Sequence, residues 1–381
     1  MLDDASRRRD FPSLEGMTYL NTAAEGIPPL VVGEALAQYF RDHQLGMDGR
    51  ERHYAQLEAA KQLTARVYGL SSAEVAICSC SSEAYNLAAL ALQLRPGDEV
   101  VINDLDFPAG ATPWLQPSSP ATVKVWRSRA GALRVEDLAV LLGPRTRLVT
   151  SSLVSFYNGF MIPLPAVIEA VRAHSPALLA LDVTQAVGRV PLNLAGVDLI
   201  ISSTHKWILA SHGGGLVGVP AARAPEWTVP AGGWFNLKNQ VPLGPEHLDV
   251  VESQPGAPSF AVGMPNFPAI YAIRAALEYI QGVGVTAIDA AARPLVRACL
   301  DGLARLPVEL LTPSEDDALA GIIAFRHPKM ETLQHALRGA GVHVMAHAGR
   351  LRVALHGYNT AADVERLLDT LEEALQHVEA R

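Results

Sequence analysis

Cysteine is scarce in this sequence, with only Cys78, Cys80 and Cys299 among 381 residues. Three cysteines at this spacing cannot build the disulfide framework of a small secreted domain, and such scarcity is typical of a reducing compartment. Cys78 and Cys80 lack a second ligand pair at zinc-type spacing. We therefore interpret them as small residues of a buried strand and expect no metal site.

Positive charge and long apolar runs are also lacking. Lys and Arg total 31 against 39 Asp and Glu, which gives a net charge of −8 without any basic stripe. This balance argues against a nucleic-acid partner. No run approaches the roughly 20 apolar residues of a membrane span, and the start, MLDDASRRRD, is charged. We expect a soluble, cytoplasmic protein with no membrane partner.

Hydrophobic residues make up 49% of the sequence, enough for the cores of one large domain and a smaller one. From about residue 30 to 220, helical periodicity alternates with short runs rich in Val, Ile and Leu. This alternation predicts a mostly parallel sheet with helices on both faces, and such sheets bind ligands at the carboxyl ends of their strands. The strand-like segments are 75–80, 99–104, 122–126, 147–155, 178–183 and 198–203.

The pattern changes after roughly residue 265, where a smaller α/β domain is predicted. Its expected elements are a long helical stretch to Leu306, strands at 321–325 and 351–355, and helices at 331–341 and 362–378. The intervening segment 231–260 is rich in Pro and Gly and has little periodicity. We expect a long functional loop there.

Two charged residues follow neighbouring strand-like segments. Asp182 ends one segment, and Lys206 stands just after the other, in ISSTHKW. Because parallel strands end at one edge of a sheet, the two side chains should share a pocket, where a carboxylate is costly without a cationic partner. Pyridoxal 5′-phosphate (PLP) offers that partner in its ring nitrogen, and its aldehyde captures a lysine amine as a Schiff base.

Five segments resemble, in order, those of the class V aminotransferases, fold type I PLP enzymes that include cysteine desulfurases, isopenicillin N epimerase-like proteins and C–S lyases. They are YLNTAAEGIPP, CSSEAYN, LDVTQAVG, SSTHKW and LRVALHGYNT, between residues 19 and 360. The resemblance implies an α/β fold, with a mostly parallel seven-stranded sheet in a large PLP-binding domain, residues 21–264. Residues 1–20 and 265–381 would form the smaller α/β domain.

The resemblance also assigns the cofactor contacts of the strand ends. Lys206 is similar to the Schiff-base lysine, Asp182 to the partner of the pyridine nitrogen and Gln185 to the partner of the ring hydroxyl. Ser203 and His205 would face the phosphate.

Three further residues resemble cofactor-binding positions. Ser81 and Ser82 stand directly before a predicted helix, whose free N–H groups and dipole favour a phosphate. An ordinary helix N-cap is the alternative for these serines. Phe107 occupies the position of a ring over the cofactor, unless it is a core residue.

For the substrate, the resemblance points first to Arg352, in the strand-like segment LRVAL. A guanidinium fork suits a carboxylate, so an amino acid is the expected substrate; a surface salt bridge is the alternative. Ala24, Trp234 and His347 are further candidates for substrate contacts. His343 and His347 at i and i+4 do not suggest a metal pair, because the segment is strand or loop.

The sequence departs from the family pattern at three points. Cysteine desulfurases carry a nucleophilic cysteine shortly before the arginine motif, and the stretch 342–351 has none, which disfavours persulfide formation. Met345 stands where desulfurases tend to have a second arginine. Met264 replaces a threonine that in relatives reaches the neighbouring subunit's phosphate. The resemblance still implies a homodimer, with the 231–260 loop reaching toward the partner.

The resemblance implies an enzyme that acts on an amino acid through an external aldimine, with Lys206 moving the Cα proton. Transamination is the leading expectation, while elimination, as in C–S lyases, and epimerisation use the same early steps. A non-catalytic binding protein of the same fold is the alternative from another class. The complete set of Asp182, Gln185, His205 and Lys206 favours the enzyme.

Overall fold

The centre of the molecule is a seven-stranded sheet in the order β2-β8-β7-β6-β5-β3-β4. The structure is a computed structural model that describes residues 1–238 and 250–379. All neighbouring strands are parallel except at β8, which runs antiparallel to β2 and β7. The bounds are β2 Val75–Cys78, β3 Glu99–Asn103, β4 Thr122–Trp126, β5 Thr146–Ser152, β6 Leu178–Asp182, β7 Leu199–Ser203 and β8 Gly215–Gly218. The mostly parallel seven-stranded sheet expected from the family resemblance is confirmed.

The inner strands of the sheet are buried on both faces, and their apolar side chains form a core on each face. Along β6, Leu179 and Leu181 pack into one core cluster, whereas Leu178 and Ala180 join the other, as side chains alternate across a strand. Helices α3 and α7 contribute to the first cluster and α4 to the second. The helices of this part are α2 Leu30–His43, α3 Arg50–Tyr68, α4 Ser81–Leu92, α5 Pro108–Ala111, α6 Val135–Leu141 and α7 Leu164–His174.

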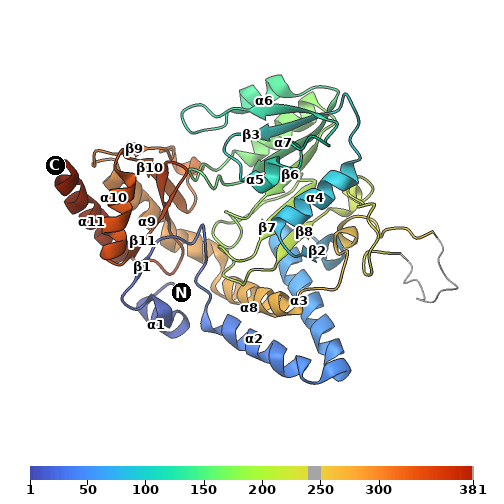
Figure 1. Cartoon of the computed structure of the whole chain (residues 1–381), viewed down its shortest axis with the longest axis horizontal. Helices are drawn as coiled ribbons and strands as arrows, with labels where there is room; N and C mark the ends of the chain where they lie inside the picture. The colour runs from blue at the N-terminus through green and yellow to red at the C-terminus, as the bar shows by residue number, and fades with distance from the viewer. Residues whose placement is uncertain (239–249, 380–381) are drawn as a thin grey trace.

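A second, four-stranded antiparallel sheet has the order β12-β13-β10-β9. Figure 1 shows it gathered with the last helices at one end of the molecule. The first helix is α1, Asp4–Asp10. It is followed by the short strand β1, Thr18–Tyr19, which pairs in parallel with β11, Val342–His343. The other elements are β9 Glu309–Leu310, β10 Ile322–Arg326, β12 Met345–His347, β13 Arg350–Ala354, α9 Val285–Leu303, α10 Met330–Gly339 and α11 Ala361–Glu379.

The long helical stretch predicted up to Leu306 is two helices. Helix α8, Phe267–Val283, ends at Gly284, whose φ of +89° suits glycine, and α9 begins at Val285. Helix α8 packs against α2 and α3, and its apolar side chains join the core beneath the seven-stranded sheet (Figure 1). The sequence predicts a large domain of residues 21–264 and a small domain of residues 1–20 and 265–381. This division assigns α8 to the small domain, although the helix packs against α2 and α3 of the large one.

The described residues of segment 231–260 contain a short 3-10 helix, Ala257–Phe260, and an isolated antiparallel bridge between Leu237 and Ser253. Residues 239–249 lie outside the described residues. Trp234 in this segment is 53% exposed. Among the described helices, none has the length and apolar character needed to cross a membrane.

Candidate active site

A cavity of about 180 Å³ lies where β6, β7 and the start of α4 meet. It forms at the carboxyl ends of the parallel strands, where such sheets bind ligands. Its walls bring together seven of the eight predicted cofactor residues from the ends of three elements, and Phe107 completes the set. The lining residues are Cys80, Ser81, Ser82, Phe107, Ser152, Phe156, Asp182, Thr184, Gln185, Ser203, His205 and Lys206.

Lys206 and Asp182 face the cavity without forming an ion pair with each other or with any described residue. Burial lowers the pKa of the Lys206 ammonium, which Asp182 partly opposes. Burial raises the pKa of the Asp182 carboxyl, although its Oδ1 accepts a hydrogen bond from the Thr184 backbone N–H at 2.7 Å. A buried carboxylate without a cation is costly, so the site is suited to a ligand with a cationic nitrogen.

The first turn of α4 forms another wall of the cavity. Ser203 Oγ donates to Ser81 Oγ at 2.9 Å, which links β7 to the helix N-terminus. Ser82 is exposed, and Cys80 is the N-cap, its Sγ accepting from the Glu83 backbone N–H at 3.4 Å. The helix dipole and the free N–H groups of this turn favour an anion.

The N-terminal segment closes the cavity beside Gln185. Gln185 Nε2 donates to the Ala23 carbonyl at 3.1 Å, and Ala24 is half-buried next to it. The Gly26 N–H donates to the His205 carbonyl at 2.8 Å. A Cβ at Gly26 would lie 2.0 Å from the Lys206 carbonyl oxygen, so only glycine allows this approach.

Phe107 is not a core residue, because it is 41% exposed. Its ring centroid lies 5.1 Å from Lys206 Nζ, and the ring packs edge-on against Phe156. The structure thus places Phe107 over the cavity, as the family resemblance expects of a ring that covers the cofactor.

The sequence reasoning missed Asp106, which anchors Phe107. Asp106 Oδ1 accepts from the Phe107 backbone N–H at 3.1 Å and from the Ser152 hydroxyl, and Oδ2 accepts from Asn103 Nδ2 at 3.3 Å. Burial raises the pKa of the Asp106 carboxyl to about 7, and Asp182 adds to this shift. An acid two residues after the end of a predicted buried strand was the signal that could have found it.

Arg352 lies on β13 and is 2% exposed. Its Nη1 donates to the Phe156 carbonyl at 2.9 Å, but its buried Nε has no partner among the described residues. Burial and the neighbouring Arg350 lower its pKa to about 10, so Arg352 stays charged at neutral pH. Arg350, which the sequence reasoning missed, donates to three backbone carbonyls, including Tyr157 O at 2.5 Å, and therefore clamps the 155–158 loop.

None of the four predicted substrate residues lines the cavity, although Arg352 contacts the lining residue Phe156, and Ala23, which precedes Ala24, contacts Gln185. The other two are Trp234 and His347. Trp234 is exposed and donates its backbone N–H to the Val262 carbonyl at 2.9 Å. His347 is an exposed residue of β12, and its carbonyl accepts from Arg350 Nη1 at 2.9 Å. Their substrate roles stay predictions for an assembly larger than one chain.

Glu25, His205 and His212 bring a carboxylate oxygen and two ring nitrogens within 4.8 Å of one another. The two imidazoles stack at 4.2 Å with an interplanar angle of 19°, so their nitrogen lone pairs do not converge on one point. His212 Nε2 already meets Glu25 at 2.9 Å. Burial is the main cause that lowers the pKa of His205 to about 4, and the neighbouring Lys206 and His212 add to the shift. His205 is therefore uncharged at neutral pH. The geometry is that of a hydrogen-bonded stack beside Lys206.

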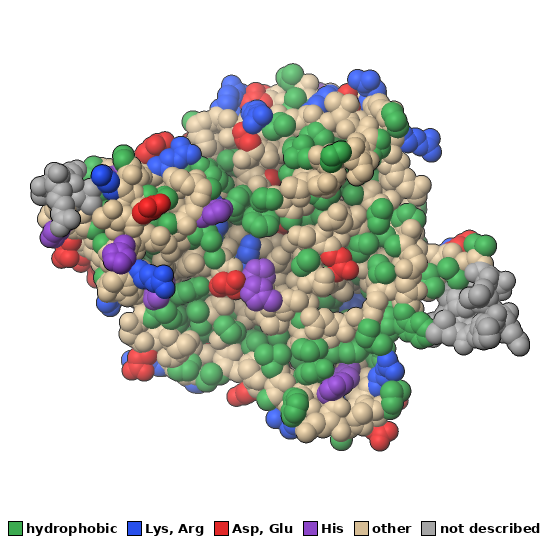
Figure 2. Space-filling model, viewed as in Figure 1, with side chains coloured by type: hydrophobic (Ala, Val, Ile, Leu, Met, Phe, Trp, Pro, Cys, Tyr) green, Lys and Arg blue, Asp and Glu red, His purple; other side chains and the backbone are tan. Residues whose placement is uncertain are grey.

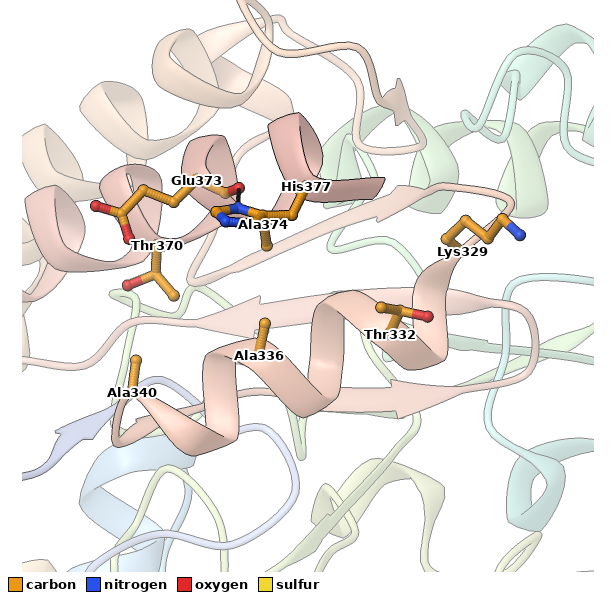
Figure 3. Close-up of a pocket in the computed structure, with 8 residues that line it drawn as sticks. All are labelled: Lys329, Thr332, Ala336, Ala340, Thr370, Glu373, Ala374 and His377. Atoms are coloured by element: carbon orange, nitrogen blue, oxygen red, sulfur yellow. Dashed lines mark hydrogen bonds between the residues drawn. The ribbon is translucent and has the colours of Figure 1, made fainter. Parts of the chain in front are cut away.

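A larger cavity of about 510 Å³ lies between α10 and α11 (Figure 3). Small side chains, including Ala336, Ala340 and Ala374, line it, with Lys329 at one end. The ring of His377 is directed to the Glu373 carbonyl of its own helix. This cavity lies between two helices and away from the carboxyl ends of the parallel strands, so the smaller cavity at the strand ends is the candidate active site.

The residues of the smaller cavity fit PLP. Among the described residues, Asp182 is a buried carboxylate without a cation partner and Lys206 is an amine without an acid partner, and the start of α4 offers anion-binding N–H groups in the same cavity wall. These three groups match the ring nitrogen, the aldehyde and the phosphate of PLP.

A family model described as aminotransferase class V matches residues 18–367. A probable cysteine desulfurase of Pseudomonas putida is 27% identical over 99% of both chains. Another, of Mycolicibacterium paratuberculosis, is 28% identical over 91% of this chain, which spans only 52% of that relative's length.

Two solved structures of C-DES share the fold at 22% identity. One is the cystine C–S lyase with its reaction product cysteine persulfide, with a TM-score of 0.85 over 95% of this chain and 98% of the other. The second, a C-DES variant, holds glycine covalently linked to the PLP cofactor, with a TM-score of 0.86 over 96% of this chain and 98% of the other.

Proposed function

Because this chain belongs to the class V aminotransferase family, whose members depend on PLP, we propose that it is a PLP-dependent carbon–sulfur lyase that acts on a sulfur-containing amino acid. The relatives are named cysteine desulfurases, and one structural neighbour is a C–S lyase. Elimination therefore replaces transamination, the leading expectation from the sequence, which becomes the second candidate.

The positions of the three cysteine thiols favour elimination over desulfuration. The 342–351 stretch next to Arg352 contains no cysteine, and Cys78 and Cys299 are buried. Cys80 is exposed but is the N-cap of α4, at the anion-binding end of the cavity. No thiol is thus placed beside the substrate side chain to accept sulfur, and we propose that the sulfur product leaves directly.

PLP, when bound, supplies an electron sink for the charge that develops at the substrate Cα. Asp182 would face its ring nitrogen, Gln185 its ring oxygen, and Ser81, Ser82, Ser203 and His205 its phosphate. Phe107 would cover the ring. Each role agrees with the position of that residue in the cavity wall.

Lys206 is the proposed catalytic residue, because its amine can bind the cofactor and later move the Cα proton. Its lowered pKa increases the fraction of uncharged amine at neutral pH, which is the form that attacks a carbonyl and accepts a proton. The Asp182 charge limits this shift. The centroid of the Phe107 ring lies 5.1 Å from this amine.

Arg352 is the proposed substrate-binding residue. Its guanidinium is buried and charged, and its Nε has no partner among the described residues. A buried donor without an acceptor is costly, so a substrate carboxylate would supply a missing partner. With the carboxylate held there, the substrate Cα is oriented between β13 and Lys206.

Product analysis tests the function. The PLP-loaded protein is incubated with L-cystine, L-cysteine and a panel of other amino acids, with and without a keto acid, and products are identified by mass spectrometry. We expect pyruvate, ammonia and a sulfur product from a sulfur amino acid without a keto acid. A strict requirement for a keto acid would favour transamination, and inversion of the amino acid would favour epimerisation. Absence of product from every amino acid would favour a binding protein.

A variant with all three cysteines replaced by serine separates elimination from desulfuration. We expect it to keep most of the turnover, measured as pyruvate release, at a lower thermal stability, because Cys78 and Cys299 are buried in apolar clusters. Loss of turnover with an intact fold would show that a thiol takes part.

A further inference from the structure

We propose that Trp207 is a positioning residue that orients the Gln185 amide, so that an amide N–H, and not the amide oxygen, is presented to the cofactor cavity. Trp207 is fully buried and does not line the cavity itself. The inference rests on the proposed function, because the acceptor of this N–H would be the ring oxygen of PLP.

The contact between the two side chains determines which amide atom is which. Trp207 Nε1 donates to Gln185 Oε1 at 2.6 Å, and both residues are buried. An indole nitrogen can only donate, and only the oxygen of an amide can accept. The orientation of the amide therefore follows from the chemistry of its partner.

The other end of the amide has one donor left for a ligand. Gln185 Nε2 carries two N–H groups, and one of them meets the Ala23 carbonyl at 3.1 Å. The second has no acceptor in the part of the chain that the structure describes, and Gln185 lines the cavity. This N–H is suited to a ring oxygen with negative charge, whereas a reversed amide would place oxygen against oxygen.

Trp207 is held in one position by its backbone and by its ring. The Gly357 N–H donates to His356 Nδ1 at 2.7 Å, so the proton of this uncharged imidazole is on Nε2, which meets the Trp207 carbonyl at 2.9 Å. The imidazole and indole rings also stack with centroids 5.6 Å apart. A Cβ at Gly321 would lie 2.6 Å from the indole, so the ring fits tightly against that glycine.

The test replaces Trp207 by Phe, which removes the N–H and keeps a buried ring. Without its partner the amide can rotate, and the ionised ring oxygen loses a donor. We expect the pH midpoint of the visible absorption band of the PLP-loaded protein to rise by about 0.5 to 1 pH unit, and the dissociation constant for PLP to rise about three- to tenfold. Unchanged values in a folded variant would overturn the proposal.

Trp227 provides the matched control. It is also fully buried, but its indole N–H has no hydrogen-bond partner among the described residues. Trp227→Phe should leave both the midpoint and the PLP affinity at the wild-type values. An equal shift in this variant would show that any buried indole has the same effect.

Gln185→Met tests whether Trp207 acts through the amide. In that background Trp207→Phe should cause no further shift of the midpoint, because the two residues act in one chain. Additive shifts would overturn the proposal.

A measurement on the cofactor-free protein separates this inference from the proposed function. In the ¹⁵N spectrum, the Trp207 indole N–H resonance should move in Gln185→Met while that of Trp227 stays in place. A Trp207 resonance that does not move would overturn the inference. A wild-type protein that shows no visible band with PLP would instead overturn the proposed function.

Discussion

Arg352 tests, at the scale of a single residue, whether the substrate is a carboxylate. Truncation to Ala would leave the substrate charge unmatched in a buried site, a loss of about 2 to 5 kcal/mol. We expect kcat/KM to fall by roughly 30-fold to several thousand-fold. Arg352→Lys should recover only part of the loss, because an ammonium lacks the planar fork. The affinity for PLP should be maintained.

A control for this variant is Arg326→Ala on the neighbouring strand β10. The Arg326 side chain is 46% exposed, and its Nη2 donates to the hydroxyl of Tyr157, which does not line the cavity, at 2.6 Å. We therefore expect a change in kcat/KM of less than about threefold. Near-normal kcat/KM for Arg352→Ala would make Arg352 a structural arginine.

His356 predicts how stability depends on pH. Burial lowers its pKa to about 3, so it is uncharged in the native state and takes up a proton on unfolding below the unfolded pKa of about 6.5. The contribution of His356 to the free energy of unfolding is therefore present above pH 6.5 and is lost as the pH falls toward 3. Between pH 6.5 and 4.5 the loss should be about 2 to 3 kcal/mol.

His356→Gln removes this proton uptake. In urea unfolding at pH 7 and 4.5, we expect the stability difference between the wild type and the variant to shrink at the lower pH. His335→Gln, at an exposed position of α10, should leave the wild-type pH dependence as it is. A difference that stays constant with pH would contradict the prediction.

At the residue scale, the sequence pointed to the groups at strand ends but not to the groups that hold them. Asp182 and Lys206 could be predicted because they interrupt apolar runs, and the structure places both in the cavity. Arg350 and His356 act through contacts across the fold, such as the 2.9 Å contact from His356 to the Trp207 carbonyl, which no local pattern encodes.

At the scale of an element, the first turn of α4 is the proposed phosphate site. Ser82→Ala removes one hydroxyl donor to a charged group, so we expect the dissociation constant for PLP to rise about 10- to 100-fold. Binding of pyridoxal, which has no phosphate, should stay unchanged and is the internal control, measured by the same absorption titration. Equal weakening of both ligands would indicate a general distortion of the site.

The predicted elements succeeded where apolar runs were long. All six strand-like segments of the large part are strands of the central sheet. The sequence reasoning missed β8, Gly215–Gly218, because its two glycines weaken the strand pattern and only its place between β2 and β7 makes it a strand. The two-residue strand β1 likewise depends on a partner distant in sequence, β11.

At the scale of the whole molecule, an exposed apolar face supports the proposed homodimer. Figure 2 shows hydrophobic side chains gathered over the region where α2 and α8 run in Figure 1. On α2, Leu30 is 52% and Phe40 is 61% exposed, an unusual exposure for large apolar side chains in a free monomer. A second copy of the chain would cover such a face.

Leu36→Glu combined with Phe40→Glu tests this face. Light scattering should show a dimer for the wild type and a monomer for the double variant, with unchanged circular dichroism, because two buried carboxylates would oppose association. Val140→Glu, at a position that is 85% exposed on α6, should remain dimeric. A wild-type monomer with full activity at high dilution would contradict the proposal.

The pairing of β2 with β8 has a consequence for biosynthesis. Among the described strands, β2 has β8 as its only neighbour in the sheet, and the hydrogen bond that joins Ser81 to Ser203 spans 122 residues. While the chain grows on the ribosome, β2 and the start of α4 therefore stay without their partners until residue 218 has emerged. Closure of such a distant pair is slow, and the waiting edge is open to aggregation. The time for which the growing chain needs a chaperone should therefore depend on how late β8 pairs with β2.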